Sequence, residues 1–226
     1  MSLEVLIALL GWGTLVGVDL VSLPQMMIAR PLVAGTVAGA ILGDLESGLK
    51  LGVIFELLQY DILPVGAVRY PEYGPATVAA VATAHGAAGA LGLGLGAVVG
   101  LVIGLLGGIT MHLMRRINSR IVSKATAALE SGDPRVLVRM HVGGLLRDFL
   151  RAAVVTGLGL GIAWLVPPHI TGVLTPRGAT VLAGAAVAAA FAAGTAGTLR
   201  LVGRGPNLAW FAAGLSGGVV VAAWLW

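Results

Sequence analysis

The chain has 226 residues, no cysteine and a formal net charge of +4. Hydrophobic residues make up 58% of it and charged residues only 11%, whereas soluble domains are about 25% charged. This composition excludes an ordinary soluble domain, a disulfide framework and a cysteine-based metal site. The sequence pI of 10.1 does not indicate nucleic-acid binding, because the basic residues cluster beside apolar stretches, as membrane topology requires. We therefore predict one all-α, polytopic membrane domain over residues 1–226, with re-entrant or broken helices.

The N-terminal third, residues 1–75, is predicted to be a broken-helix substrate region. Its first helix is predicted to cover Glu4 to Val21, and we do not expect it to be a cleaved signal, because no basic residue precedes the apolar stretch. A polar junction, SLPQMMIARP, follows. Two apolar runs come next, Pro31 to Leu42 and Leu49 to Leu58, and both are shorter than the roughly 20 residues of a straight span.

The remainder divides into three parts. Residues 76–114 are rich in Gly and Ala and are long enough for two spans, with a turn expected within Ala87 to Gly96. Residues 115–140 form a polar, basic segment, which the positive-inside rule makes cytoplasmic. Residues 141–226 hold the C-terminal spans, and helix-breaking residues mark the ends of these spans: Pro167, Pro168, Pro176, Gly203 and Pro206. The last two tryptophans, Trp224 and Trp226, are expected at the outer membrane interface.

Glu56 is the first candidate functional residue. It lies inside the apolar run VIFELL, and an ionisable group at membrane depth is costly and therefore a candidate for function. It is suited to accept hydrogen bonds from the hydroxyls of a polar substrate. The alternative is a structural carboxylate, held by backbone amides or paired with Arg30 or Arg69.

Asp19 and Gln25 flank the junction before Arg30. Together they offer acceptors and an amide donor to a sugar, or they terminate and cap the helix. Arg30 precedes a proline, which disfavours helix there, and we expect it to tie two re-entrant elements together.

Six further charged residues receive structural or open assignments. Asp61 and Arg69 are expected to form an ion pair, with substrate contact as the alternative, and Asp44 is expected in a turn. Arg147, Asp148 and Arg151 lie either at the inner interface or on a helix buried in the protein. The four histidines lack partners at metal-ligand spacing and are expected to be structural: His85, His112, His141 and His169.

From Arg30 to Glu72 the sequence resembles the IIC membrane subunit of the mannose/fructose/sorbose family of sugar phosphotransferase systems. A weaker likeness covers the polar segment and His141-Val142, and the resemblance extends over the chain. The matching features are Arg30-Pro31-Leu32, Gly39 to Asp44, Leu51-Gly52, Glu56-Leu57, Gly66-Ala67 and Pro71-Glu72.

This resemblance implies a translocation subunit rather than an enzyme, without a cofactor, a catalytic residue or a phosphorylated residue of its own. It implies a bacterial plasma-membrane protein that pairs with a IID-type subunit, forms an oligomer, and moves a sugar by an elevator-like shift. Cytoplasmic IIA and IIB phosphocarrier proteins would then supply the phosphoryl group. The resemblance also implies that Gln25 and Glu56 line the sugar site, with Asp19 nearby.

Several residues depart from the family pattern and are candidates for modifying specificity. Asp61 and Arg69 add charges where small or apolar residues are usual, and Tyr60 and Tyr70 add bulk beside them. Glu72 stands where an Asp is usual. These departures leave two other readings open: a permease uncoupled from phosphotransfer, and a regulatory membrane scaffold.

Overall fold

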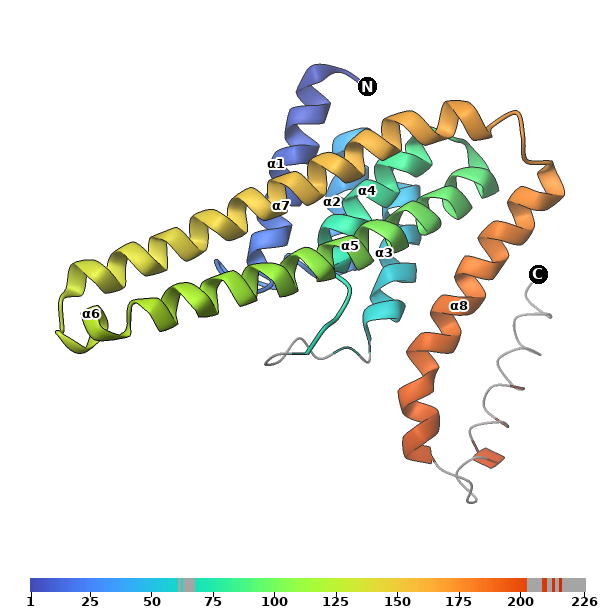
Figure 1. Cartoon of the computed structure of the whole chain (residues 1–226). Coiled ribbons are helices and arrows are strands. Elements are labelled where there is room, and N and C mark those ends of the chain that lie inside the picture. Colours follow the sequence, from blue (N-terminus) through green and yellow to red (C-terminus); the bar gives the residue numbers. More distant parts are fainter. Residues whose placement is uncertain (61, 63–67, 203–208, 211–212, 214–215, 217–226) are drawn as a thin grey trace.

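The computed structural model describes residues 1–60, 62, 68–202, 209, 210, 213 and 216, with side chains described to residue 196 and at the last four positions. All regular structure within these residues is helical (Figure 1). The prediction of an all-α protein is confirmed. Asp61, Gly203, Pro206, Trp224 and Trp226 lie outside the described residues.

Two long helices form the frame of the molecule. Helix α5 (Gly89–Lys124) and helix α7 (Pro134–Ile170) run side by side, and the short α6 (Thr126–Glu130) lies between their polar ends (Figure 1). Together with α8 (Pro176–Val202), they contain three stretches that are long and apolar enough to cross a membrane. Their outer faces carry exposed large apolar side chains such as Ile109, Phe149 and Leu158. The prediction of a polytopic membrane protein is thereby confirmed.

Four shorter helices complete the fold: α1 (Leu3–Asp19), α2 (Pro31–Leu42), α3 (Leu45–Gln59) and α4 (Tyr73–His85). Helices α1, α3 and α4 contact α5 or α7, whereas α2 packs on α1, α3 and α4. Helix α4 is the centre of the fold, and all its residues from Tyr73 to Ala84 are buried. Its alanines let α5, α7 and α2 approach closely, as small residues do in membrane proteins. With only 13 residues it is too short for a span of about 20 residues.

Helices α2 and α3 form a tight hairpin of half-length helices. A Cβ on Gly35 would lie 2.6 Å from the carbonyl oxygen of Gly48, so the two backbones are in contact. Gly43 ends α2 in the left-handed conformation (φ 71°), and Asp44 caps α3 by accepting from the Ser47 amide at 3.1 Å. The turn predicted at Asp44 is confirmed. The apolar run Pro31 to Leu42 coincides with α2, whereas α3 begins four residues before the predicted Leu49, because of this cap.

Two predicted breaks differ from the structure. The turn expected within Ala87 to Gly96 is shorter and earlier, since α4 ends at His85 and α5 starts at Gly89 and continues to Lys124. The glycines of α5 do not break the helix but let neighbours pack on it; a Cβ on Gly94 would lie 2.9 Å from the Leu182 side chain. Helix α7 also continues past Pro167 and Pro168, each of which lacks the N–H for one helical hydrogen bond, and it ends two residues later at Ile170.

Candidate functional site

The junction between α1 and α2 is organised by Asp19. Its two carboxylate oxygens accept from the backbone amides of Met26 at 2.7 Å and Ala29 at 3.0 Å. The carboxylate is nearly inaccessible, with 2% of the residue exposed. These contacts hold the junction itself and do not cap a helix, since Met26 and Ala29 both precede Arg30, the N-cap of α2.

Gln25 lies in the segment that Asp19 holds. Its backbone is in the left-handed region (φ 59°), as is that of Met27 (φ 64°), and such a conformation is unusual for residues other than glycine. The Gln25 side chain is exposed and makes no hydrogen bond to another described residue. Its amide is therefore available to a ligand.

Arg30 and Glu56 are brought together across the α2–α3 hairpin. The Arg30 guanidinium forms an ion pair with Oε1 of Glu56, while Oε2 accepts from the backbone amide of Leu32 at 3.1 Å. Arg30 therefore ties the two short helices together, in agreement with the sequence expectation. Both side chains remain accessible, at 40% for Arg30 and 19% for Glu56. A carboxylate has about four acceptor positions, so Glu56 retains capacity for ligand hydroxyls.

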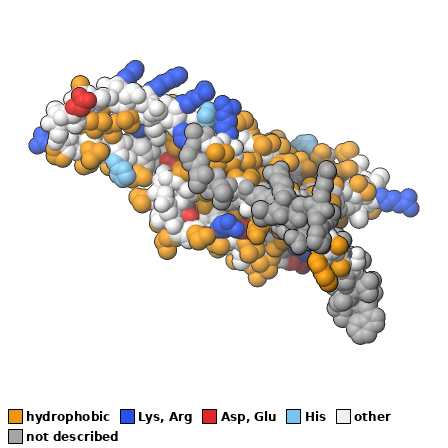
Figure 2. Space-filling view, turned by 90° about the horizontal axis from the view of Figure 1, so that it is seen from below, with side chains coloured by type: hydrophobic (Ala, Val, Ile, Leu, Met, Phe, Trp, Pro, Cys, Tyr) orange, Lys and Arg blue, Asp and Glu red, His pale blue; other side chains and the backbone are white. Residues whose placement is uncertain are grey.

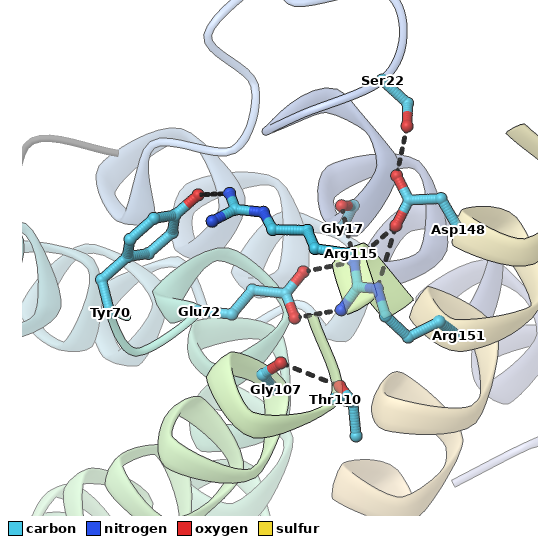
Figure 3. Close-up of polar contacts among 9 residues, drawn as sticks. All are labelled: Gly17, Ser22, Tyr70, Glu72, Gly107, Thr110, Arg115, Asp148 and Arg151. Carbon is cyan, nitrogen blue, oxygen red and sulfur yellow. Dashed lines mark hydrogen bonds and ion pairs between the residues drawn. The ribbon is translucent and has the colours of Figure 1, made fainter. Parts of the chain in front are cut away.

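A second, buried charge cluster surrounds Arg151 on α7 (Figure 3). The Arg151 guanidinium contacts both oxygens of Glu72, at 2.5 and 2.9 Å, and Asp148 at 2.9 Å. It also donates to the carbonyl oxygen of Gly17 at 3.2 Å, and the Ser22 hydroxyl donates to Asp148. Of the two positions considered for Asp148 and Arg151, the structure therefore shows burial inside the protein, on the inner face of α7.

Glu72 joins this cluster to α5. Its amide donates to the Gly104 carbonyl at 2.8 Å, and a Cβ on Gly107 would lie 2.7 Å from its Oε2 atom. The side chain is fully buried. Sequence reasoning did not predict this partnership, because Glu72 and Arg151 are 79 positions apart. The spacing of Asp148 and Arg151 in an apolar stretch was the one signal available.

Arg69 and Tyr70 lie beside the polar end of α5. Arg115 donates to the Tyr70 hydroxyl at 2.6 Å, and its guanidinium carbon lies 5.3 Å from the centre of the Tyr70 ring. Arg69 is exposed and lines a cavity of about 230 Å³ together with His112. The predicted pairing of Arg69 with Asp61 involves a residue outside the described part of the chain.

Comparison with known proteins assigns the fold and the family. The family model described as the sorbose-specific IIC component of the phosphotransferase system matches residues 3–222. The sorbose-specific EIIC component of Klebsiella pneumoniae is 41% identical over 56 residues, which are 25% of this chain and 21% of the relative. The mannose-specific EIIC component of Escherichia coli K12 is 24% identical over 132 residues, 58% of this chain and 49% of the relative. These matches span from about a fifth to about half of the relatives' own length.

Two solved structures share the fold. A chain titled "Structure of membrane protein" superposes with a TM-score of 0.69 at 17% identity, covering 100% of this chain and 96% of the other. A chain of the complex between the mannose transporter ManYZ and microcin E492 superposes with a TM-score of 0.54 at 18% identity, covering 97% of this chain and 87% of the other. Because the family model extends over nearly the whole sequence, the chain belongs to the family of sorbose-specific IIC components of the phosphotransferase system.

Proposed function

We propose that this chain is the translocation subunit of a mannose-type sugar phosphotransferase system. It binds a sugar within the membrane and presents it for phosphorylation by a partner protein. Family membership over residues 3–222 supports this class of function. The structural observation that carries the proposal is the accessible Arg30–Glu56 pair on two helices too short to span a membrane, because transporters build substrate sites from such discontinuous helices.

Exposure and free acceptor positions distinguish Glu56 from Glu72 and Asp19. The Glu72 side chain is 0% exposed and both its oxygens contact Arg151, so a solute cannot reach it without opening the core. Asp19 has both oxygens bound to backbone amides. Glu56 combines exposure with unused acceptor positions, and Arg30 adds donors beside it. A hydroxyl-rich ligand needs acceptors and donors together.

Asp19 and Gln25 have different parts in this proposal. Gln25 contributes an exposed amide that both donates and accepts hydrogen bonds. Asp19 is a positioning residue, which holds the strained segment that carries Gln25. Arg69 and Asp61 remain candidates for adjusting specificity, because they add charges near the end of the same region.

The proposed assembly contains more than this chain. A IID-type membrane subunit, cytoplasmic IIA and IIB proteins and a bacterial plasma membrane complete the proposed system, and the membrane subunits form an oligomer. The exposed apolar faces of α5 and α7 suit contact with lipid or a membrane partner. No residue of this chain is proposed to carry the phosphoryl group, and none is proposed to be catalytic.

Reconstitution tests the proposed function. The chain is co-expressed with a IID-type subunit, and the complex is purified and placed in vesicles loaded with phosphorylated IIB protein. We expect external radiolabelled sugar to appear inside as sugar phosphate only when IIB is phosphorylated. Uptake of unmodified sugar without IIB would identify an uncoupled permease, and a folded complex that binds no sugar would favour the scaffold.

A further inference from the structure

A polar cavity lies where α5 and α7 approach their basic ends. Its volume is about 400 Å³, and its polar lining consists of Ser22, Arg115, Asn118, His141 and Arg147. These residues come from the α1–α2 junction, from α5 and from α7. None of the side chains proposed to contact sugar lines it.

Arg147 is held in position within this cavity. Its Nε donates to the Asn118 side-chain oxygen at 2.7 Å, which leaves the two terminal nitrogens for other acceptors. Within the described residues Arg147 forms no ion pair, since the neighbouring Asp148 is bound by Arg151 and Ser22. A half-buried guanidinium without a carboxylate partner is suited to an anionic ligand.

The charge around the cavity has one sign. Arg115 is oriented by its bond to Tyr70 and lines the same cavity as Arg147, and His141 is exposed at its edge. Figure 2 shows Lys and Arg gathered over the part of the molecule formed by α6 and the adjoining ends of α5 and α7. Guanidinium groups bind phosphate oxygens through paired, charge-assisted hydrogen bonds. Basic pockets between membrane helices hold phosphate headgroups of anionic lipids.

We propose that this cavity binds the phosphodiester headgroup of an anionic phospholipid. The apolar part of the lining favours a lipid over a free phosphate ion. Val21, Ile121 and Leu145 line the cavity together with the basic residues, and they would contact the glycerol and upper acyl chain. The position agrees with this ligand, because the cavity lies at the end of the apolar stretches of α5 and α7, where a membrane interface is expected.

Native mass spectrometry of the full-length chain tests this site. The protein is titrated with phosphatidylglycerol, with phosphatidylcholine of the same acyl chains, and with inorganic phosphate. We expect the wild-type chain to bind phosphatidylglycerol at least about tenfold more tightly than phosphatidylcholine. Arg147→Gln should weaken phosphatidylglycerol binding by about tenfold, because it removes charge-assisted bonds. Arg120→Gln is the matched control, since Arg120 is exposed on α5 and does not line the cavity.

Three results would overturn the proposal. One is equal binding of the two lipids by the wild-type chain, a measurement that does not depend on any variant. Another is an equal loss in Arg120→Gln and Arg147→Gln, which would indicate general surface charge. The third is Arg147-dependent binding of inorganic phosphate without a lipid preference, which would assign the site to a free anion. Arg147→Lys serves as the second variant if Arg147→Gln does not fold. It keeps the charge but not the paired donors, so its preference for phosphatidylglycerol over phosphatidylcholine should be intermediate.

Discussion

Arg151 binds the carboxylate of Glu72 through both of its terminal nitrogens, at 2.5 and 2.9 Å, inside the helical core. The same guanidinium contacts Asp148 and the Gly17 carbonyl, so one side chain links α1, the segment before α4, and α7. Bidentate, charge-assisted bonds of this kind have strict geometry. The cluster therefore holds together segments that are distant in the sequence.

Loss of the Arg151 side chain should lower the free energy of unfolding. Arg151→Ala leaves Glu72 and Asp148 buried without their cation, and breaking a buried pair in this way costs about 3–5 kcal/mol. Arg139→Ala, on an exposed position of the same helix, should change stability by less than about 0.5 kcal/mol. Denaturant unfolding in mild detergent measures both. Equal stability of the two variants would mean that the cluster is not a structural element.

Glu56→Gln should weaken sugar binding while the fold is retained. The variant keeps the shape and removes the charge, and a lost charge-assisted bond of about 1.5–3 kcal/mol corresponds to tenfold or more in affinity. Glu46→Gln is the matched control, because Glu46 lies exposed on the same helix and forms a surface ion pair with Lys50. Equilibrium binding to the folded complex gives both affinities. If Glu56→Gln binds normally and Glu56→Ala is merely unstable, Glu56 is structural and attention moves to Asp61 and Arg69.

Asp19→Asn should loosen the α1–α2 junction. A carboxylate accepts from both the Met26 and Ala29 amides, whereas an asparagine presents an NH₂ group to one of them. A buried donor left without a partner costs about 1–3 kcal/mol. Hydrogen exchange at Met26 and Ala29 should therefore accelerate. Asp133→Asn is the control, because Asp133 is an exposed cap of α7 and Asn caps a helix about as well as Asp. If hydrogen exchange at Met26 and Ala29 is the same in the two variants, Asp19 does not have the positioning role.

Gly35→Ala should destabilise the α2–α3 hairpin. The added methyl would lie 2.6 Å from the Gly48 carbonyl oxygen, and a backbone neighbour cannot rotate away as a side chain does. Overpacking of this kind costs about 1–3 kcal/mol. At Gly161 on α7 there is open space, so Gly161→Ala should be neutral or stabilising by up to about 1 kcal/mol. Thermal unfolding distinguishes the two, and a Gly35→Ala variant as stable as wild type would show that the helices separate easily.

The membrane topology inferred from charge can be tested by labelling single introduced cysteines, because the chain has no native cysteine. Ser123→Cys is exposed near the end of α5 and should react with an impermeant thiol reagent only in inside-out vesicles. Val173→Cys, which is 74% exposed between α7 and α8, should react in intact cells. The reverse pattern would invert the orientation.

Local rules in the sequence predicted several elements of the fold. The length of the apolar run from Pro31 to Leu42 and the turn at Asp44 depend on residues within a few positions, and both agree with the structure. The position of Arg30 before a proline likewise indicated a link between short elements. Glu56 was a candidate because its apolar neighbours make a charge costly there, and its role in binding sugar stays a prediction.

Other features depend on which distant residues meet, and only the tertiary structure decided them. Most residues of α4 were predicted to belong to a membrane span, because residues 76–114 are long enough for two spans. They instead form a short central helix that packs against α5 and α7. A turn was expected within Ala87 to Gly96, yet α5 continues from Gly89 through these glycines, because neighbouring helices fill the space beside them. From the sequence, Glu72 was noted only as standing where the family usually has Asp. Its partner Arg151 lies on another helix, and no local pattern encodes a contact between residues that packing alone brings together.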